Sequence, residues 1–438
     1  MSTMQAAREQ RAPLLSDSAT FWSLAGVLGL FLFAASAPSP LYQIYAAAWH
    51  FSPLTLTIVF ALYAIALLAA LLVTGRLSDH LGRRPVIFAA VSVEIAAMAC
   101  FSLAGSTVFL GLARVLQGAA TGAAIGALSA ALVELSADLA PGLAPVVSSA
   151  APTFGLAAGG LGASLLVQYA PAPTRLVYWL LLAGFAAGAL LAVVMRETGQ
   201  RRPGALASLV PTAGVPVQAR ATFVRVLPCL IALWALSGFY LSLGPGLATT
   251  IVGSGNLLWG GLVIFLLCGS GGVAVVVGKN WTARSAMLYG CACLFAGVGL
   301  TFGAIATSLF VLFAIGSVIA GIGFGLSFLG AFRLLSGLAA PFERAGTIAA
   351  IYIVSYLAFS IPVVIAGIAT RGFGTHDVAL AFSAAVAVLA AIGTSAGLAA
   401  HEPALPSHPS VPPGAEDLTP CPGTVPPCAR PRQPSHQR

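Results

Sequence analysis

Charged residues are scarce in this chain of 438 residues. Asp, Glu, Lys and Arg make up only 7% of the sequence, whereas a water-soluble domain has about 25%. Apolar residues make up 59%, and the mean hydropathy is +0.97. This composition excludes a conventional water-soluble enzyme. At about 20 residues per span, a chain of this length has room for about a dozen membrane helices with short connections.

Lysine is nearly missing, since 19 of the 20 basic residues are Arg and the remaining one is Lys279. A phosphate-binding P-loop requires Gly, any four residues, and then Gly-Lys followed by Ser or Thr. Here Asn280 follows Lys279, and Val273 occupies the position of the first glycine. An ATP-driven pump is therefore excluded. The net charge of +8 is spread singly or in pairs between apolar runs, which is typical of membrane-flanking charges and not of a nucleic-acid-binding surface.

The seven cysteines provide neither a disulfide framework nor a metal site. Most lie in apolar runs, where we expect them to be small packing residues. Cys421 and Cys428 lie in the tail, without the paired spacing of zinc ligands. The sequence also lacks a recognisable nucleophile–base pair or a pair of catalytic carboxylates. We therefore predict that the protein is not an enzyme and uses no cofactor and no metal.

Twelve apolar runs of helical length alternate with short polar segments. The first six lie near residues 21–46, 54–74, 85–104, 107–133, 143–168 and 175–195. The second six lie near residues 224–247, 256–277, 285–305, 308–332, 345–369 and 378–399. These runs predict an all-α membrane protein with twelve transmembrane helices in two six-helix bundles.

The polar segments divide the chain into parts. We expect a cytoplasmic N-terminal segment 1–20, a first bundle 21–195, a cytoplasmic linker 196–223, a second bundle 224–400 and a disordered cytoplasmic tail 401–438. The tail contains eleven prolines and cannot bury a core. Residues 35–37 resemble a signal-peptide cleavage site, but the apolar run continues past them. We expect this first run to be retained as a helix.

The basic residues also predict the orientation, because Lys and Arg in short loops concentrate on the cytoplasmic side. If the N-terminus is inside, seventeen of the 20 basic residues fall in cytoplasmic segments. Arg175 and Arg371 fall outside, and Arg114 lies within a span. We therefore predict an integral multi-pass protein of the plasma or inner membrane with both termini in the cytoplasm.

Between the second and third runs stands the ten-residue string GRLSDHLGRR, residues 75–84. Gly75 can end one helix, Gly82 permits a tight return, and Asp79 favours the positive N-terminus of the next helix. Arg83 and Arg84 hold the loop at the inner surface.

This string resembles the G-x-L-x-D-x-x-G-R-R/K signature of the major facilitator superfamily of transporters. The resemblance implies two repeated six-helix bundles, and it implies that Asp79 and Arg83 form a charge lock against the other half of the molecule. In the second half, the corresponding segment 278–284 keeps a glycine and a basic residue but has lost the acid. This weak echo is consistent with two repeats.

The fourth run contains Leu110, Arg114, Gln117 and Gly118, which resemble the L-x-x-x-R-x-x-Q-G pattern of the same family. On a helix, Arg114, Gln117 and Thr121 share one polar face. An arginine inside the membrane costs about 2.5–3.5 kcal/mol on insertion scales, which favours a functional role over simple bonding to backbone carbonyls.

The fifth run carries a stripe of small residues that includes Gly155, Gly159 and Gly160. It resembles the family's antiporter motif, G-x-x-x-G-P-x-x-G-G, except that Leu156 occupies the proline position. The glycines predict close helix packing and gating, whereas the missing proline weakens the argument for drug–proton exchange.

Glu94 lies near the centre of the third run and is the only acid deep inside a predicted span. Because the third and fourth runs turn back near Gly105, Glu94 and Arg114 should lie within about one helical turn in depth at 1.5 Å per residue. We hypothesise a proton-dependent contact between them. The alternative is that Glu94 stays protonated in a packing interface.

The family resemblance implies that helices one, four, seven and ten line the substrate cavity. The candidate substrate contacts on these helices are Tyr42, Gln43, Trp234, Ser237, Tyr240, Ser327, Phe328 and Arg333. Pro362 can interrupt the eleventh helix and so serve gating or a simple kink.

These features together predict a secondary active transporter that works by alternating access. Proton-coupled efflux of hydrophobic or cationic small molecules is the preferred activity, and we expect a monomer whose partners are the substrate, protons and the lipid bilayer. One alternative is the uptake or exchange of a neutral metabolite such as a sugar. Another is a non-transporting membrane sensor or scaffold with the same fold.

Overall fold

The described part of the chain is almost entirely helical in the computed structural model. It comprises residues 15–399 apart from 137, 138, 140, 141, 200, 201, 212, 341 and 342. The first fourteen residues and the predicted tail 401–438 lie outside it. Within the described residues, eleven helical segments are long and apolar enough to cross a membrane. The last of them consists of two helices that meet at Gly374 (φ 76°, ψ 162°), so the twelve predicted helices are present.

Two helices of the first half, α2 and α4, begin at a serine whose side chain caps the first turn. Ser52 caps α4 by accepting a hydrogen bond from the Thr55 amide, and Pro53 follows at the first helical position. Its elements are α2 (Asp17–Ser36), α3 (Pro38–Trp49), α4 (Pro53–Thr74), α5 (Ser78–Leu81), α6 (Arg83–Ser102), α7 (Thr107–Leu135), α8 (Leu143–Tyr169) and α9 (Leu176–Val194).

The second half differs from the sequence prediction in two places. The helix α10 begins at Val217 and not near 224, so part of the predicted linker is helical. The chain stays helical through Pro362 and leaves helical φ/ψ at Gly374, so Pro362 does not interrupt its helix. The remaining elements are the short 3-10 helices η1 (Ala207–Leu209) and η2 (Gly278–Asn280) together with α10 (Val217–Ser242), α11 (Gly244–Val252), α12 (Leu258–Val277), α13 (Ala283–Thr307), α14 (Phe310–Gly337) and α15 (Arg344–Ala399).

The first spanning helix of each half is divided near the same end. The sequence predicted continuous runs, but α2 gives way to α3 at Ala37, just before Pro38. Likewise, α10 gives way to α11 at Leu243, just before Gly244 and Pro245. Proline has no N–H to donate and clashes with the preceding turn, which explains both positions. Corresponding interruptions in two repeated halves are typical of transporters, whose substrate sites lie at such helices.

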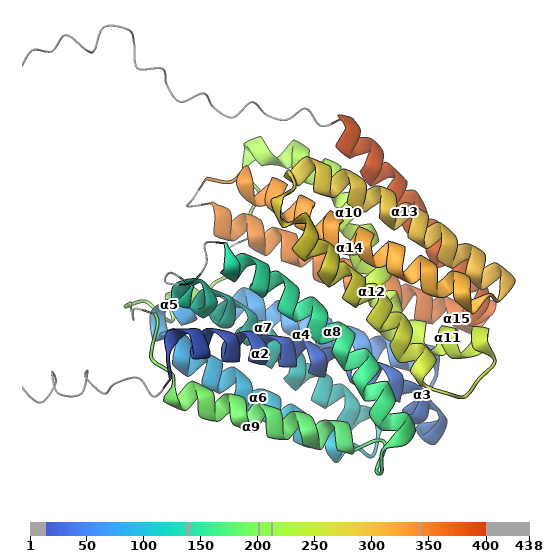
Figure 1. Cartoon of the computed structure of the whole chain (residues 1–438), viewed down its shortest axis with the longest axis horizontal. Helices are drawn as coiled ribbons and strands as arrows, with labels where there is room; N and C mark the ends of the chain where they lie inside the picture. The colour runs from blue at the N-terminus through green and yellow to red at the C-terminus, as the bar shows by residue number, and fades with distance from the viewer. Residues whose placement is uncertain are drawn as a thin grey trace, which may run out of the picture. The chain divides into compact units, whose positions relative to one another are not determined.

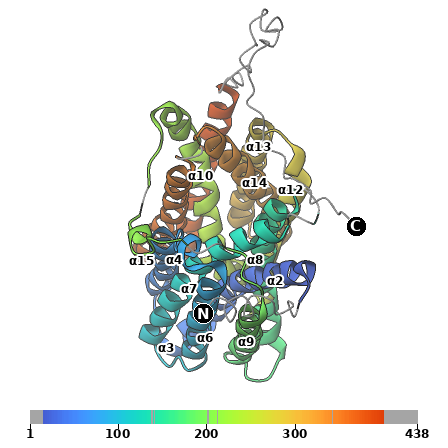
Figure 2. The ribbon, with the colours of Figure 1, turned by 90° about the vertical axis from the view of Figure 1, so that its left-hand side faces the viewer.

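Helices pack mainly within their own half. In the first half α7 contacts α2, α4 and α6, and in the second half α14 contacts α12 and α13 while α10 contacts α15. Figures 1 and 2 show the same grouping from two directions, with α3 and α11 at one end in Figure 1 and α5 at the other. The long helices join the halves mainly through two pairs, α8 with α12 and α4 with α15.

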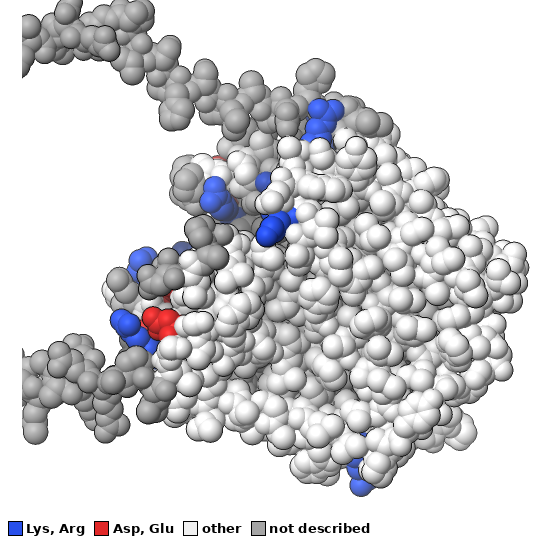
Figure 3. Space-filling view, in the orientation of Figure 1, with Lys and Arg blue, Asp and Glu red and all other residues white. Residues whose placement is uncertain are grey.

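The outer surface is suited to lipid. Large apolar side chains face outward, such as Val108 at 77% and Leu103 at 74% exposed. On the face drawn in Figure 3, most charged atoms gather near the end where Figure 1 places α5, and the broad region between the ends is uncharged. This is the surface that a bilayer-embedded helix bundle requires.

Candidate functional site

The loop between α4 and α6 is organised by Arg83. The Arg83 guanidinium donates to Asp79 Oδ1 at 2.5 Å and to Ser78 Oγ at 2.7 Å. It also donates twice to Glu134 Oε1, at 2.9 and 3.1 Å. Glu134 is the penultimate residue of α7. Arg83 therefore ties the loop to a second helix of the same half.

A third carboxylate, that of Glu197, closes this loop from the other side. Glu197 Oε1 accepts hydrogen bonds from the Arg83 amide at 2.7 Å and from the Gly199 amide at 3.1 Å. A carboxylate at the first amides of α6 is favoured by the positive helix N-terminus. Gly82 makes this approach possible, because its φ is +97° and a Cβ there would collide with the Glu197 carboxyl group.

Arg84 anchors the same loop to α9. Its Nε donates to the Ala192 carbonyl at 2.8 Å, and its Nη2 donates to the Val193 carbonyl. These carbonyls lie in the last turn of α9, where a cation is favoured. Gly75, the first residue of the string, is the C-cap of α4 and donates its amide to the Leu71 carbonyl at 2.9 Å.

The predicted charge lock between the two halves is not among the contacts of the described residues. Asp79 and Arg83 bind partners within the first half. The halves instead meet at the opposite end, where Thr249 Oγ1 of α11 donates to Gln43 Oε1 of α3 at 3.1 Å. A protein that opens one end at a time is not expected to hold both ends closed together. The charge lock therefore stays a prediction for the conformation in which the halves close at the end of α5 and open at the end of α3 and α11.

The residues Arg114, Gln117 and Glu94 form a chain of hydrogen bonds in the interior of the first half, and all three are 0% exposed. Arg114 Nη1 donates to Gln117 Oε1 at 2.6 Å and to the Ala35 carbonyl at 2.9 Å. Gln117 Nε2 donates to the Ala34 carbonyl at 2.9 Å and to Glu94 Oε1 at 3.4 Å. The two charged residues are thus linked through Gln117.

No direct ion pair between Arg114 and Glu94 exists in the described chain. Glu94 Oε2 and Arg114 Nη2 have no hydrogen-bond partner among the described residues. Burying a charged group without a partner is costly, so this cluster is sensitive to the protonation state of the carboxyl group. Thr121, the third residue of the predicted polar face, donates to the Gln117 carbonyl of its own helix at 2.8 Å.

Aromatic rings surround the Arg114 guanidinium. Its Cζ lies 5.4 Å from the Tyr42 ring centroid, 5.3 Å from that of Tyr63 and 5.9 Å from that of Phe101. Arg114 Nε also donates to the Tyr42 hydroxyl at 2.6 Å. Cation–π contacts of this kind stabilise a desolvated cation. Tyr42 is therefore a partner of Arg114, and it is only 1% exposed.

The glycine stripe of α8 brings helices together. A Cβ at Gly155 would collide with the Gly29 carbonyl, and one at Gly159 would collide with the Phe33 carbonyl and Ser36 Oγ of α2. Gly160 faces the other half, where Ile264 of α12 fills the space of a side chain. The stripe therefore allows α8 to contact both α2 and α12 closely.

Three of the candidate substrate contacts in the second half belong to one aromatic cluster or its edge. The Trp234 ring contacts Phe328, with centroids 5.4 Å apart, and also Phe324, Tyr356 and Phe359 at 5.7–5.9 Å. Ser237 follows one turn later on α10 and is 1% exposed.

The other three candidates in the second half lie elsewhere. Tyr240 is 0% exposed, and its hydroxyl bonds to Thr301 and Ser317 Oγ atoms at 3.1 and 3.0 Å. Ser327 is buried and contacts Cys291 Sγ at 3.7 Å. Arg333 donates to the Lys279 carbonyl at 2.8 Å and to the Trp281 carbonyl at 3.3 Å, so it holds the loop after α12.

Several residues with central contacts were not among the sequence candidates. Tyr63 and Phe101 contact Arg114, Glu134 and Glu197 bind Arg83, and Tyr356 and Phe359 enclose Trp234. The acids had a signal in the sequence, because Glu134 and Glu197 closely follow the fourth and sixth apolar runs. The aromatic residues could not, because an apolar run does not distinguish a lipid-facing ring from a buried one.

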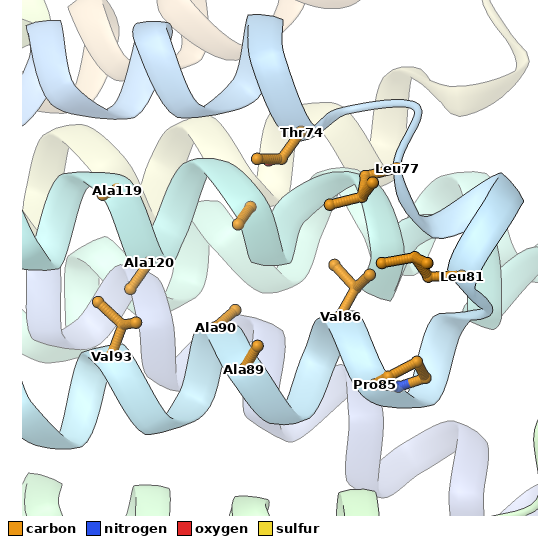
Figure 4. Close-up of a pocket in the computed structure, with 11 residues that line it drawn as sticks. Thr74, Leu77, Leu81, Pro85, Val86, Ala89, Ala90, Val93, Ala119 and Ala120 are labelled. Atoms are coloured by element: carbon orange, nitrogen blue, oxygen red, sulfur yellow. The ribbon is translucent and has the colours of Figure 1, made fainter. Parts of the chain in front are cut away.

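An apolar pocket of about 230 Å³ lies between α4, α6 and α7 (Figure 4). Leu77 and Leu81 of the Arg83-bound loop form one end of it. Thr74 is the only hydroxyl-bearing lining residue, and its Oγ1 already donates to the Ala70 carbonyl at 2.7 Å. No candidate substrate contact lines this pocket.

The repeated halves, the interrupted first helices and the buried charges define a polytopic helical membrane protein of the secondary-transporter class. The family model for the Major Facilitator Superfamily matches residues 24–361, so the chain belongs to this superfamily of transporters.

Solved structures share the fold at low sequence identity. A bacterial homologue of the human lysosomal transporter Spinster, solved inward-facing and unoccupied, is 14% identical with a TM-score of 0.69, and the match covers 87% of this chain and 97% of that one. A mutant of the nucleoside transporter NupG is 13% identical with a TM-score of 0.68, covering 86% and 99%. A mutant of the peptide transporter POT in complex with sulfate is 12% identical with a TM-score of 0.66, covering 86% and 93%. A sequence comparison with curated proteins gives no match.

Proposed function

We propose that this transporter couples the efflux of hydrophobic or cationic small molecules to the entry of protons. The two bundles, 21–195 and 224–400, rock about a shared site near the midplane while both termini stay in the cytoplasm. The observation that carries the proposal is the buried hydrogen-bonded chain Glu94–Gln117–Arg114.

This series of hydrogen bonds connects the carboxyl group of Glu94, which can bind a proton, to the division between α2 and α3. Glu94 bonds to Gln117, and Gln117 and Arg114 bond to the carbonyls of Ala34 and Ala35. Those carbonyls stand immediately before the division between α2 and α3. A proton on Glu94 removes its negative charge and leaves Arg114 as the uncompensated cation, which changes the hydrogen bonding at the division. Protonation is thereby coupled to the position of α3, which meets α11 of the other half.

The related structures are consistent with small-molecule transport but differ in substrate. They include a nucleoside transporter and a peptide transporter, so likeness of fold does not choose between efflux and uptake. Leu156, in the proline position of the antiporter motif, keeps uptake or exchange of a neutral metabolite as a second candidate.

The test is flux into and out of proteoliposomes with an imposed pH gradient. The panel compares lipophilic cations with neutral sugars and amino acids. We expect the gradient to drive lipophilic compounds against their concentration, and sugars and amino acids to be unaffected. Accumulation that ignores the gradient would remove proton coupling, and gradient-driven sugar uptake would favour the second candidate.

Glu94→Gln tests the proposed coupling residue. Glutamine keeps the size of the side chain and can still accept from Gln117, but it cannot exchange a proton. We expect the pH gradient to lose its effect, with a fall in gradient-driven flux of about tenfold or more, while downhill exchange continues. Asp377→Asn is the control, because Asp377 is an exposed acid near the end of a spanning helix. If Glu94→Gln keeps pH-dependent flux at the wild-type level, the coupling role of Glu94 is refuted.

A further inference from the structure

The aromatic cluster around Trp234 lies where four helices of both halves meet. Trp234 belongs to α10, Phe324 and Phe328 to α14, and Tyr356 and Phe359 to α15. Phe60 of α4, in the first half, contacts Phe359 with ring centroids 4.8 Å apart. Trp234 is partly exposed, whereas Tyr356 and Phe359 are only 8% and 5% exposed. Phe328 is partly exposed as well, so the indole and the Phe328 ring are the two rings of the cluster that a ligand can reach.

Three polar groups beside this cluster have no hydrogen-bond partner among the described residues. They are Trp234 Nε1, Ser237 Oγ and Ser355 Oγ, each with almost no exposed surface on the atom itself. Ser237 shares a helix face with Trp234, three residues away, and Ser355 shares one with Phe359, four residues away. Buried donors without partners are rare, and three of them on the helices that form this cluster indicate a site for a ligand.

The two serines differ from their neighbours. Within a membrane helix, a serine hydroxyl usually bonds to a carbonyl one turn earlier. Ser242 of α10 does so with Gly238, and Ser360 of α15 does so with Tyr356, both at 2.7 Å. Ser237 and Ser355 do not satisfy themselves in this way, although each lies on the same helix as its satisfied counterpart. Their hydroxyls remain available to a bound molecule.

The charges around the cluster disfavour a cationic ligand. In the described part of the second half the acids are Glu343 and Asp377. Glu343 directly precedes α15, and Asp377 lies three residues after the break at Gly374, so each stands near the start of one of its two helices. Thus neither described acid of the second half belongs to the helix segments that form the cluster. On the first-half side, Tyr63 lies one turn from Phe60 and contacts the Arg114 guanidinium. Glu94 lies in the same hydrogen-bonded cluster as Arg114, so an acid and a base lie together beyond the rings and that side offers no uncompensated negative charge to a cation.

We propose that Trp234, Ser237 and Ser355 bind an uncharged, flat aromatic molecule that carries a hydrogen-bond acceptor. The molecule stacks on the indole, its acceptor takes the Trp234 Nε1 hydrogen, and the serine hydroxyls complete the site. Because the indole nitrogen can only donate, the acceptor is required. This inference rests on the proposed function, since it names the substrate class of the same transporter and selects the hydrophobic over the cationic part of it.

The experiment measures equilibrium binding to the full chain in lipid nanodiscs, without a gradient. Three bicyclic probes of similar size are titrated: coumarin, which is neutral and has a carbonyl acceptor; naphthalene, which is neutral and has none; and N-methylquinolinium, which is cationic and has none. Binding is followed by quenching of tryptophan fluorescence. We expect coumarin to bind about tenfold more tightly than naphthalene, and N-methylquinolinium to bind most weakly.

Two variants assign the effect to the site. Trp234→Phe keeps an aromatic ring but removes the Nε1 donor, and Ser237→Ala removes one hydroxyl. Both should weaken coumarin binding several-fold and leave naphthalene unchanged. The matched controls are Trp259→Phe, whose ring contacts Phe310 outside the cluster, and Ser360→Ala, whose hydroxyl is already bonded within its helix. Because Trp234→Phe removes the tryptophan at the site, its binding is measured by competition with a radiolabelled probe. If that variant does not fold, Ser237→Ala provides the comparison between coumarin and naphthalene.

The proposal is overturned if N-methylquinolinium binds more tightly than coumarin, if none of the three probes binds, or if the variants change all three affinities equally. Its failure is distinct from that of the proposed function. Gradient-independent flux would remove proton coupling and leave this binding site intact. Gradient-driven flux with no discrimination among the probes would remove the site and leave the transporter.

Discussion

At the scale of single residues, the hydrogen-bond networks around Arg114 and Arg83 in the first half have different physical roles. Arg114 is fully buried, so its hydrogen bonds and ring contacts offset the cost of removing a cation from water. The Arg83 side chain is 11% exposed, and that of its partner Asp79 is 49% exposed, so the carboxylate of this pair is open to solvent. An ion pair as exposed as this one contributes about 0–1 kcal/mol to stability, which is too little to explain such a network by stability alone.

Asp79→Asn should therefore impair movement and not folding. Asparagine preserves the shape of the side chain, but it gives up the charge that the predicted lock between the halves needs. We expect normal membrane insertion, a thermal midpoint close to that of the wild type, and a fall in flux of about tenfold. Flux in proteoliposomes and thermal unfolding in detergent measure the two properties separately. Undiminished flux would discredit the lock, and Asp377→Asn serves again as the exposed control.

At the scale of secondary structure, small residues decide which helices approach closely. In lipid there is no hydrophobic force between helices, so close packing at glycines supplies much of the association. Gly159 of α8 lies against the Phe33 carbonyl of α2, whereas Gly26 of α2 has nothing within 4 Å of the position of a Cβ. The two glycines thus form a matched pair for testing this contact.

Gly159→Ala should destabilise the protein and Gly26→Ala should not. The new methyl group at 159 has no space, and overpacking of this kind costs about 1–3 kcal/mol. At 26 the methyl group meets open space, and replacing a helical glycine favours the helix by about 0.5–1 kcal/mol. Thermal unfolding in detergent checks both variants. Equal midpoints for the two would mean that the contact between α2 and α8 is not as close as described.

The twelve helices and the superfamily could be predicted because their signals are local. Apolar runs, the string at 75–84 and the pattern around Arg114 each depend on neighbouring residues. The interruptions before Pro38 and Pro245 have a local signal in these prolines, but both lie inside continuous apolar runs, which predict an unbroken helix. The contacts of Trp234, Tyr240 and Arg333 could not be predicted, since lipid-facing and buried positions are equally apolar and the pattern does not show which face meets which helix.

At the scale of the whole molecule, the hydrogen bond between Gln43 and Thr249 is one of the contacts that join the two halves at one end. It joins α3 and α11, the short helices that follow the two interruptions. If the halves rock, this end must separate during each cycle, and a covalent bridge there should stop the cycle in the conformation described. The same bridge should leave a static scaffold unaffected, so it also tests the alternative of a protein that does not transport.

The variant Gln43→Cys with Thr249→Cys provides this bridge. It is made in a chain whose native cysteines are replaced by serine or alanine, and a short bifunctional thiol reagent closes it. We expect flux to fall by at least tenfold after cross-linking and to recover when a reducible cross-linker is cleaved, since only separation at this end is blocked. Each single-cysteine variant, treated with the same reagent, controls for modification without bridging. Full flux through the cross-linked protein would show that the end formed by α3 and α11 does not open during transport.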